Sequence, residues 1–208
     1  MVKDKKVIDI GCGFGANKSI VENAGGHWVG VEPYESYDGI IKADAQSLPF
    51  DDDEFDVVIM DAVLEHIPDV GKAFSEVSRV LKNNGVFIGY VAFMECFHEI
   101  SYSHLSFKAI EHYSEINSMK LEKISGGTSF GIDYHLSIIL YPIPFNIMRK
   151  IISFFIRVIF KIKSKVAFLG LKIFRKLSTK DAKDLSDLYY KVECLRQSNG
   201  FSYIVRKI

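Results

Sequence analysis

One stretch, residues 7–16 (VIDIGCGFGA), constrains the fold of this chain more than any other. Residues 7–10 predict a short buried strand, and three glycines follow at alternate positions, Gly11, Gly13 and Gly15. Glycine allows positive φ and lets the backbone approach a ligand closely, and the following segment can start a helix whose free N–H groups bind polar atoms. The pattern predicts a nucleotide-binding turn, with the ligand seated on Gly11 to Gly15.

Composition narrows the class of protein. The chain has 208 residues, zero formal net charge and 48% hydrophobic residues, which is typical of one globular domain with a full core. Because no net positive charge attracts nucleic acid, we expect no nucleic-acid partner. The apolar run near the N-terminus is too short for a signal peptide. Cys12, Cys96 and Cys194 form neither a zinc-type pair nor a disulfide framework, so we expect no metal site and a reducing, cytoplasmic compartment.

Strand and helix patterns alternate along the first part of the chain. A nearly continuous apolar run at residues 55–60 predicts a strand buried on both faces, and residues 68–81 have helical spacing, with residues 82–85 closing that helix. Such alternation requires a parallel sheet with helices on both faces and ligands at the carboxyl ends of its strands. We therefore expect an α/β, Rossmann-like, doubly wound fold. The other expected elements are helices at 18–23 and 106–119 and strands at 27–31, 39–43, 85–91, 120–125 and 201–208.

The glycines alone do not identify the ligand. Gly11, Gly13 and Ala16 also fit the GxGxxG/A dinucleotide fingerprint, which keeps an NAD-dependent oxidoreductase open. Asp9, a carboxylate inside an apolar strand, instead favours a ligand with a cationic or amino group. Glu32 falls at the end of the second strand, about twenty residues after the turn, where a ribose diol is held in Rossmann-type folds.

The order of motifs resembles that of class I S-adenosyl-L-methionine (SAM) dependent methyltransferases of the UbiE/type 11 kind. The resemblance rests on DxGxGxG from Asp9, the Asp44-Ala45 pair, the L-P-F turn, the F-D-V-V strand and the LEH segment, and it runs from Val7 to about Tyr90. It implies a mostly parallel seven-stranded sheet with the last strand reversed. The expected domains are a SAM-binding core at 1–129, a basic amphipathic helical insertion at 130–197 and the last core strand at 198–208.

The resemblance also implies roles for single residues. Glu32 would bind the ribose hydroxyls, Asp44 the adenine amino group and Ala45 N–H a ring nitrogen, with Asp9 behind the amine of the cofactor. Met60 and Asp61 would end the fourth strand beside the activated methyl group. The expected cofactor-binding residues are Asp9, Gly11, Cys12, Gly13, Gly15, Glu32, Pro33, Asp44, Ala45, Met60 and Asp61.

The reaction implied by the resemblance is in-line transfer of the SAM methyl group to a small-molecule or lipid-like acceptor. If the acceptor is a hydroxyl, a base must take its proton, and His66, His98 and His104 all follow strands whose ends face the ligand. His66 and His104 are the candidates, with His104 favoured as a pocket residue. His66 has an alternative role, which is to orient its loop through a hydrogen bond. A module that binds SAM or a partner without chemistry also stays open, because the chain begins almost at the first strand, without the preceding helical sequence that usually covers the cofactor.

The insertion has an asymmetric charge. Residues 134–180 contain ten Lys and Arg and no Asp or Glu. Residues 147–177 have apolar side chains every three or four positions, which predicts a basic amphipathic helix or helix pair, bent near Gly170. Its apolar face is expected to cap the substrate pocket. Its Lys and Arg side chains are expected to contact anionic lipid, so that an apolar or lipid-linked acceptor enters from a membrane.

Overall fold

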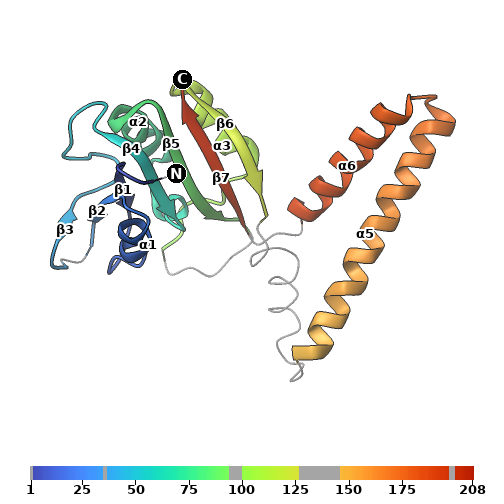
Figure 1. The fold of residues 1–208 in the computed structure, drawn as a ribbon, viewed down its shortest axis with the longest axis horizontal. Coiled ribbons are helices and arrows are strands. Elements are labelled where there is room, and N and C mark those ends of the chain that lie inside the picture. Colours follow the sequence, from blue (N-terminus) through green and yellow to red (C-terminus); the bar gives the residue numbers. More distant parts are fainter. Residues whose placement is uncertain (1, 35–36, 94–99, 127–145, 197–199) are drawn as a thin grey trace. The chain divides into compact units, whose positions relative to one another are not determined.

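A computed structural model describes residues 2–34, 37–93, 100–126, 146–196 and 200–208, which form two compact units (Figure 1). The first unit contains Met1–Ser125 and Phe201–Ile208, and the second contains Gly126–Gly200.

One sheet with the order β3-β2-β1-β4-β5-β7-β6 forms the centre of the first unit. The pairs β1–β2, β1–β4, β2–β3 and β4–β5 are parallel, whereas β6 and β7 are antiparallel, which confirms the predicted mixed seven-stranded sheet. Strands β1 to β3 are added towards one edge of the sheet, and β4 and β5 towards the other. The order therefore reverses between β1 and β4, which is where such sheets bind ligands. The strands are β1 Lys6–Ile10, β2 His27–Glu32, β3 Ile40–Lys42, β4 Phe55–Asp61, β5 Leu81–Ala92, β6 Met119–Ser125 and β7 Gly200–Lys207.

Helices α1 (Lys18–Asn23), α2 (Val70–Val80) and α3 (Phe107–Ile116) connect the strands, and the short 3-10 helix η1 (Leu64–His66) precedes α2. Asp69 caps α2 by accepting a hydrogen bond from Lys72 N (3.0 Å), and Ser106 caps α3 by accepting one from Ala109 N (3.2 Å). All five apolar residues on one face of α2 are buried, as the helical spacing predicts.

In the first unit, two predicted boundaries differ from the structure by more than two residues; strand pairing explains one of them and local backbone geometry the other. Leu81 already pairs with Phe55, so β5 begins four residues before the predicted residue 85. The register then shifts, and residues 82–85 form an irregularity in β5 rather than a helix cap. At the other boundary, α3 ends at Ile116 because Ser118 adopts φ 55° and Met119 begins β6.

The described part of the second unit is a pair of helices joined by a short turn (Figure 1). Helix α5 (Asn146–Phe174) continues through Gly170, and α6 (Thr179–Arg196) follows it. Ser164 Oγ donates a hydrogen bond to Ser186 O (2.8 Å), which links the two helices. Among the helices described, none is both long enough and apolar enough to cross a bilayer.

Candidate functional site

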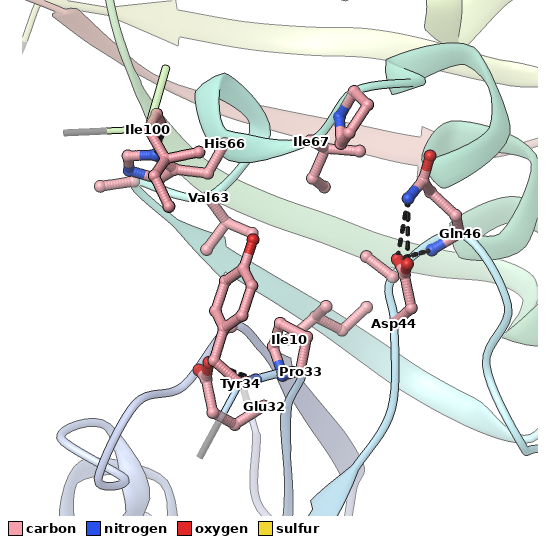
Figure 2. Close-up of a pocket in the computed structure, with 14 residues that line it drawn as sticks. Ile10, Glu32, Pro33, Tyr34, Asp44, Gln46, Val63, His66, Ile67 and Ile100 are labelled. Atoms are coloured by element: carbon pink, nitrogen blue, oxygen red, sulfur yellow. Dashed lines mark hydrogen bonds between the residues drawn. The ribbon is translucent and has the colours of Figure 1, made fainter. Parts of the chain in front are cut away.

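A cavity of about 660 Å³ lies at the carboxyl ends of the strands of the first unit (Figure 2). Its size is within the range of small-molecule sites, roughly 300 to 1,000 Å³. Six of the predicted site residues line it, namely Gly11, Glu32, Pro33, Asp44, Ala45 and His66. They come from the segments after β1, β2, β3 and β4, so the sheet brings together residues that are far apart in the sequence.

The glycine turn is shaped by positive φ at Gly11 (69°), Gly13 (53°) and Gly15 (87°). A Cβ at Gly11 would lie 2.6 Å from Val63 Cγ2, whereas a Cβ at Gly13 would have no atom within 4 Å. Gly11 N donates to Val31 O (2.8 Å), which holds the turn against the end of β2. At position 11, the positive φ and the contact with Val63 both disfavour any side chain. At position 13, only the positive φ does so, and the space beside the main chain is open.

Glu32 is held at this turn by main-chain groups. Its Oε2 accepts a hydrogen bond from Gly13 N (3.0 Å), and its Oε1 accepts one from Tyr34 N (3.4 Å). Figure 2 shows Glu32 beside Pro33 and Tyr34, with the Tyr34 ring extending towards Val63. The carboxylate is thus fixed where the turn and the end of β2 meet.

Asp44 is fixed by Gln46, a residue that the sequence reasoning missed. Gln46 N donates to Asp44 Oδ1 (2.8 Å), and the Gln46 side-chain amide lies 3.1 and 3.0 Å from the two carboxylate oxygens (Figure 2). Gln46 Oε1 accepts in turn from Asp69 N (3.2 Å), at the start of α2. The aspartate followed two residues later by a donor is a signal for an Asx turn, and it was available in the sequence.

The remaining predicted cofactor residues do not line the cavity. Asp9 is 1% exposed and accepts a hydrogen bond from Trp28 Nε1 (3.1 Å); burial raises its pKa to about 6. Burial also raises the pKa of the Cys12 thiol to about 11, so the thiol is neutral near pH 7. Asp61, at the end of β4, has a pKa raised by the same cause. The residues outside the lining are Asp9, Cys12, Gly13, Gly15, Met60 and Asp61.

The two candidate histidines have different locations. His66 lines the cavity, and its Nδ1 is hydrogen bonded to Ile100 O. His104 lies outside the lining, and its Nδ1 is hydrogen bonded to Phe93 O (3.0 Å). The structure therefore brings His66, but not His104, to the cavity that contains Glu32 and Asp44.

An apolar wall completes the cavity and was not predicted from the sequence. Val63, Ile67, Pro68 and Ile100 belong to it. These residues come from the segment after β4 and from a distant segment after β5, and no short-range pattern links them. They give the cavity a surface that suits an apolar ligand group.

Glu65 is a further buried carboxylate beside the cavity-lining residues His66 and Ile67. It is 1% exposed, its Oε1 accepts from Ala92 N (3.3 Å), and its main-chain oxygen accepts from Tyr102 N (2.8 Å). The LEH segment drew attention to this region, but only as a helix start. In the structure, Glu65 ties η1 both to the end of β5 and to the chain that follows Ile100.

Comparison with known proteins gives the site a context. A family described as "Methyltransferase domain" matches residues 8–89, which include the glycine turn, Glu32, Asp44 and His66. Over these residues, which are less than half of the chain, the protein resembles the class I SAM-dependent methyltransferases. The matched segment contains β2 to β4 and most of β1 and β5, the strands whose ends form the cavity.

Among curated methyltransferases, a sterol 4-C-methyltransferase (strm-1) from Caenorhabditis elegans is 35% identical over 99 residues, covering 40% of this chain and 30% of that protein. A sterol 24-C-methyltransferase (ERG6B) from Gibberella zeae is 31% identical over 99 residues, covering 39% of this chain and 26% of that protein. The chain thus matches less than a third of the length of either relative.

A solved structure extends the likeness of fold beyond the matched segment. The crystal structure of a putative sarcosine dimethylglycine methyltransferase from Galdieria sulphuraria superposes with a TM-score of 0.59 at 14% identity, covering 99% of this chain and 79% of that chain. At this identity the likeness concerns the fold alone.

Several residues that line the cavity fit chemical groups of SAM. Glu32 presents acceptor oxygens for a ribose diol, and Asp44 presents acceptors for an amino group. The open space at Gly13 allows a ligand to approach the main chain. The cavity therefore offers acceptor oxygens and a volume that fit this cofactor.

Proposed function

We propose that this protein is a SAM-dependent methyltransferase that acts on an apolar small-molecule or lipid-like acceptor. One observation carries the proposal: within a methyltransferase-family sheet, Glu32 and Asp44 are held by fixed hydrogen bonds on one cavity with the glycine turn. A dehydrogenase would have no evident use for Asp44 at the end of β3.

Each site residue has a proposed role. Glu32 binds the two ribose hydroxyls, Asp44 accepts from the adenine amino group, and Ala45 N–H donates to a ring nitrogen. The main chain at Gly11 and Gly13 contacts the methionine part, with Asp9 beneath it. Cys12, Gly15 and Pro33 shape the turn and the end of β2 around the cofactor, and Met60 and Asp61 end β4 beside the reacting methyl group.

When bound, SAM would supply a methyl group carried on a sulfonium sulfur. An acceptor atom would attack the methyl carbon in line, and the sulfur would leave as a neutral thioether. Holding the acceptor in line can lower the activation free energy by about 7 to 11 kcal/mol. The main contribution of the protein is therefore to position the acceptor with the walls of the cavity. If the acceptor is a hydroxyl, we propose His66 as its base: a neutral imidazole that donates from Nδ1 to Ile100 O keeps its lone pair on Nε2. His104 is the second candidate.

The apolar wall supports an apolar acceptor. Val63, Ile67 and Ile100 face a cavity that also contains the polar cofactor residues, and two relatives are named as sterol methyltransferases. We further propose a cytoplasmic protein that contacts an anionic membrane through residues 147–177, where such an acceptor is available.

Transfer of a labelled methyl group from SAM to a total lipid extract tests this function. We expect labelled product with the wild type and with Glu22→Ala, which removes an exposed carboxylate of α1 outside the cavity. Glu32→Ala should abolish most of the transfer at limiting SAM. SAM binding without transfer to lipid or polar extracts would instead support a binding module without chemistry.

A further inference from the structure

Helix α5 carries a row of apolar side chains that α6 leaves exposed. This apolar stripe recurs every three or four residues and therefore follows one face of the helix. Each member is more than half exposed, between 53% and 65%. The side of α5 that contacts α6 is a different one, marked by Ser164 and the buried Leu171. The stripe consists of Phe155, Ile159, Ile162, Val166, Leu169 and Ile173.

A row of cations runs along one edge of the apolar stripe. Its members are separated by seven, four, four and seven residues, so they share one helical face. Three of them directly precede stripe residues: Lys161 precedes Ile162, Lys165 precedes Val166 and Lys172 precedes Ile173. Helix α5 contains no Asp or Glu. This cation row consists of Lys150, Arg157, Lys161, Lys165 and Lys172, all exposed.

Charge and hydropathy together select one kind of partner. An exposed apolar stripe with only positive charge beside it complements a surface that is apolar below and anionic above, which describes a bilayer with acidic headgroups. Lysine and arginine stems can lie along apolar surface while their charged ends stay at the headgroups. A helix of 29 residues is about 44 Å long, so the stripe offers an extended contact in the plane of a membrane.

We propose that the apolar stripe of α5 docks on an anionic membrane surface, lying in the headgroup region with the cation row on the lipid phosphates. The stripe and the cation row assign the membrane contact proposed above to one face of α5. It does not require methyl transfer, because vesicle binding and SAM binding are separate measurements.

Co-sedimentation of the full chain with vesicles tests the proposal. The vesicles contain either phosphatidylcholine alone or about one part phosphatidylglycerol to two parts phosphatidylcholine. We expect binding to the anionic vesicles at low salt, weaker binding at high salt, and little binding to the neutral ones. The triple variant K161Q/K165Q/K172Q should bind the anionic vesicles about 100-fold more weakly, at roughly fivefold per lysine.

Two matched controls separate docking from unspecific effects. K42Q/K120Q/K123Q changes the net charge equally but at exposed positions of the first unit, and it should retain most of the binding. I162N/L169N removes two stripe residues and should weaken binding, whereas I116N, at a residue 61% exposed on α3, should not. Circular dichroism and SAM affinity should be unchanged in all four variants.

Several results would overturn the proposal. The wild type could remain in the supernatant with anionic vesicles, or bind both kinds equally. The two lysine triples could lose binding equally, or I162N/L169N could bind like the wild type. Sedimentation velocity showing a dimer that I162N/L169N dissociates would assign the stripe to a second copy of the chain, and a changed SAM affinity in I162N/L169N would assign it to the cofactor cavity.

Discussion

Replacing Gly11 by alanine should destabilise the first unit by more than the cost of placing alanine in a left-handed backbone conformation. An alanine at φ 69° costs about 1 to 2 kcal/mol. Its Cβ would also lie 2.6 and 2.9 Å from the two Val63 methyl carbons, and overpacking of this kind costs about 1 to 3 kcal/mol. The expected loss in the free energy of unfolding is therefore about 2 to 5 kcal/mol.

Gly39 provides the control for this measurement. It has φ 73°, but no atom lies within 4 Å of its Cβ position, so Gly39→Ala should lose only about 1 to 2 kcal/mol. Urea unfolding followed by the fluorescence of Trp28, the single tryptophan, reports on the unit that contains both glycines. Equal losses for the two variants would show that contact with Val63 does not constrain the turn.

Three further predictions concern the site. Gly13→Ala should cost as much stability as Gly39→Ala, because neither Cβ position has an atom within 4 Å. It should also weaken SAM binding in calorimetry, which Gly39→Ala should leave unchanged, because the proposed function places the main chain of Gly13 against the methionine part of SAM. The folded pKa of Asp9 is about 6, above its unfolded value, so the free energy of unfolding should fall by about 2 kcal/mol from pH 4 to 7. Asp9→Asn should flatten this dependence, and an unchanged slope in urea unfolding would contradict the prediction. Glu65→Ala should lose about 1 to 3 kcal/mol in thermal unfolding by leaving Ala92 N–H unpaired, whereas Glu65→Gln should retain most of the stability.

The sequence predicted the fold well where patterns are local. Helix α1 has the predicted bounds because glycines close it at residues 25 and 26, and β4 follows the apolar run at 55–60. The start of β5 was missed because the pairing of Leu81 with Phe55 is a long-range contact that overrides the turn-like residues 82–85.

The site was predicted only in part, for a similar reason. Glu32 was predicted from its spacing after the glycine turn, and Asp44 from the resemblance of the Asp44-Ala45 pair to the family motif. Two hydrogen bonds, from Trp28 to Asp9 and between His66 and Ile100 O, depend on how separate segments pack. The spacing of residues in the sequence does not indicate such packing. In α5, the sequence showed the amphipathic pattern but not which face α6 covers.

Calorimetry measures whether the cavity at the glycine turn binds SAM. We expect the wild type and Glu22→Ala to bind SAM and its demethylated product at one site per chain, and NAD much more weakly. Glu32→Ala should lose about 3 kcal/mol of SAM affinity, roughly a hundredfold, because two hydrogen bonds to a carboxylate are removed. Tighter binding of NAD than of SAM, or equal SAM affinity of Glu32→Ala and Glu22→Ala, would contradict the account.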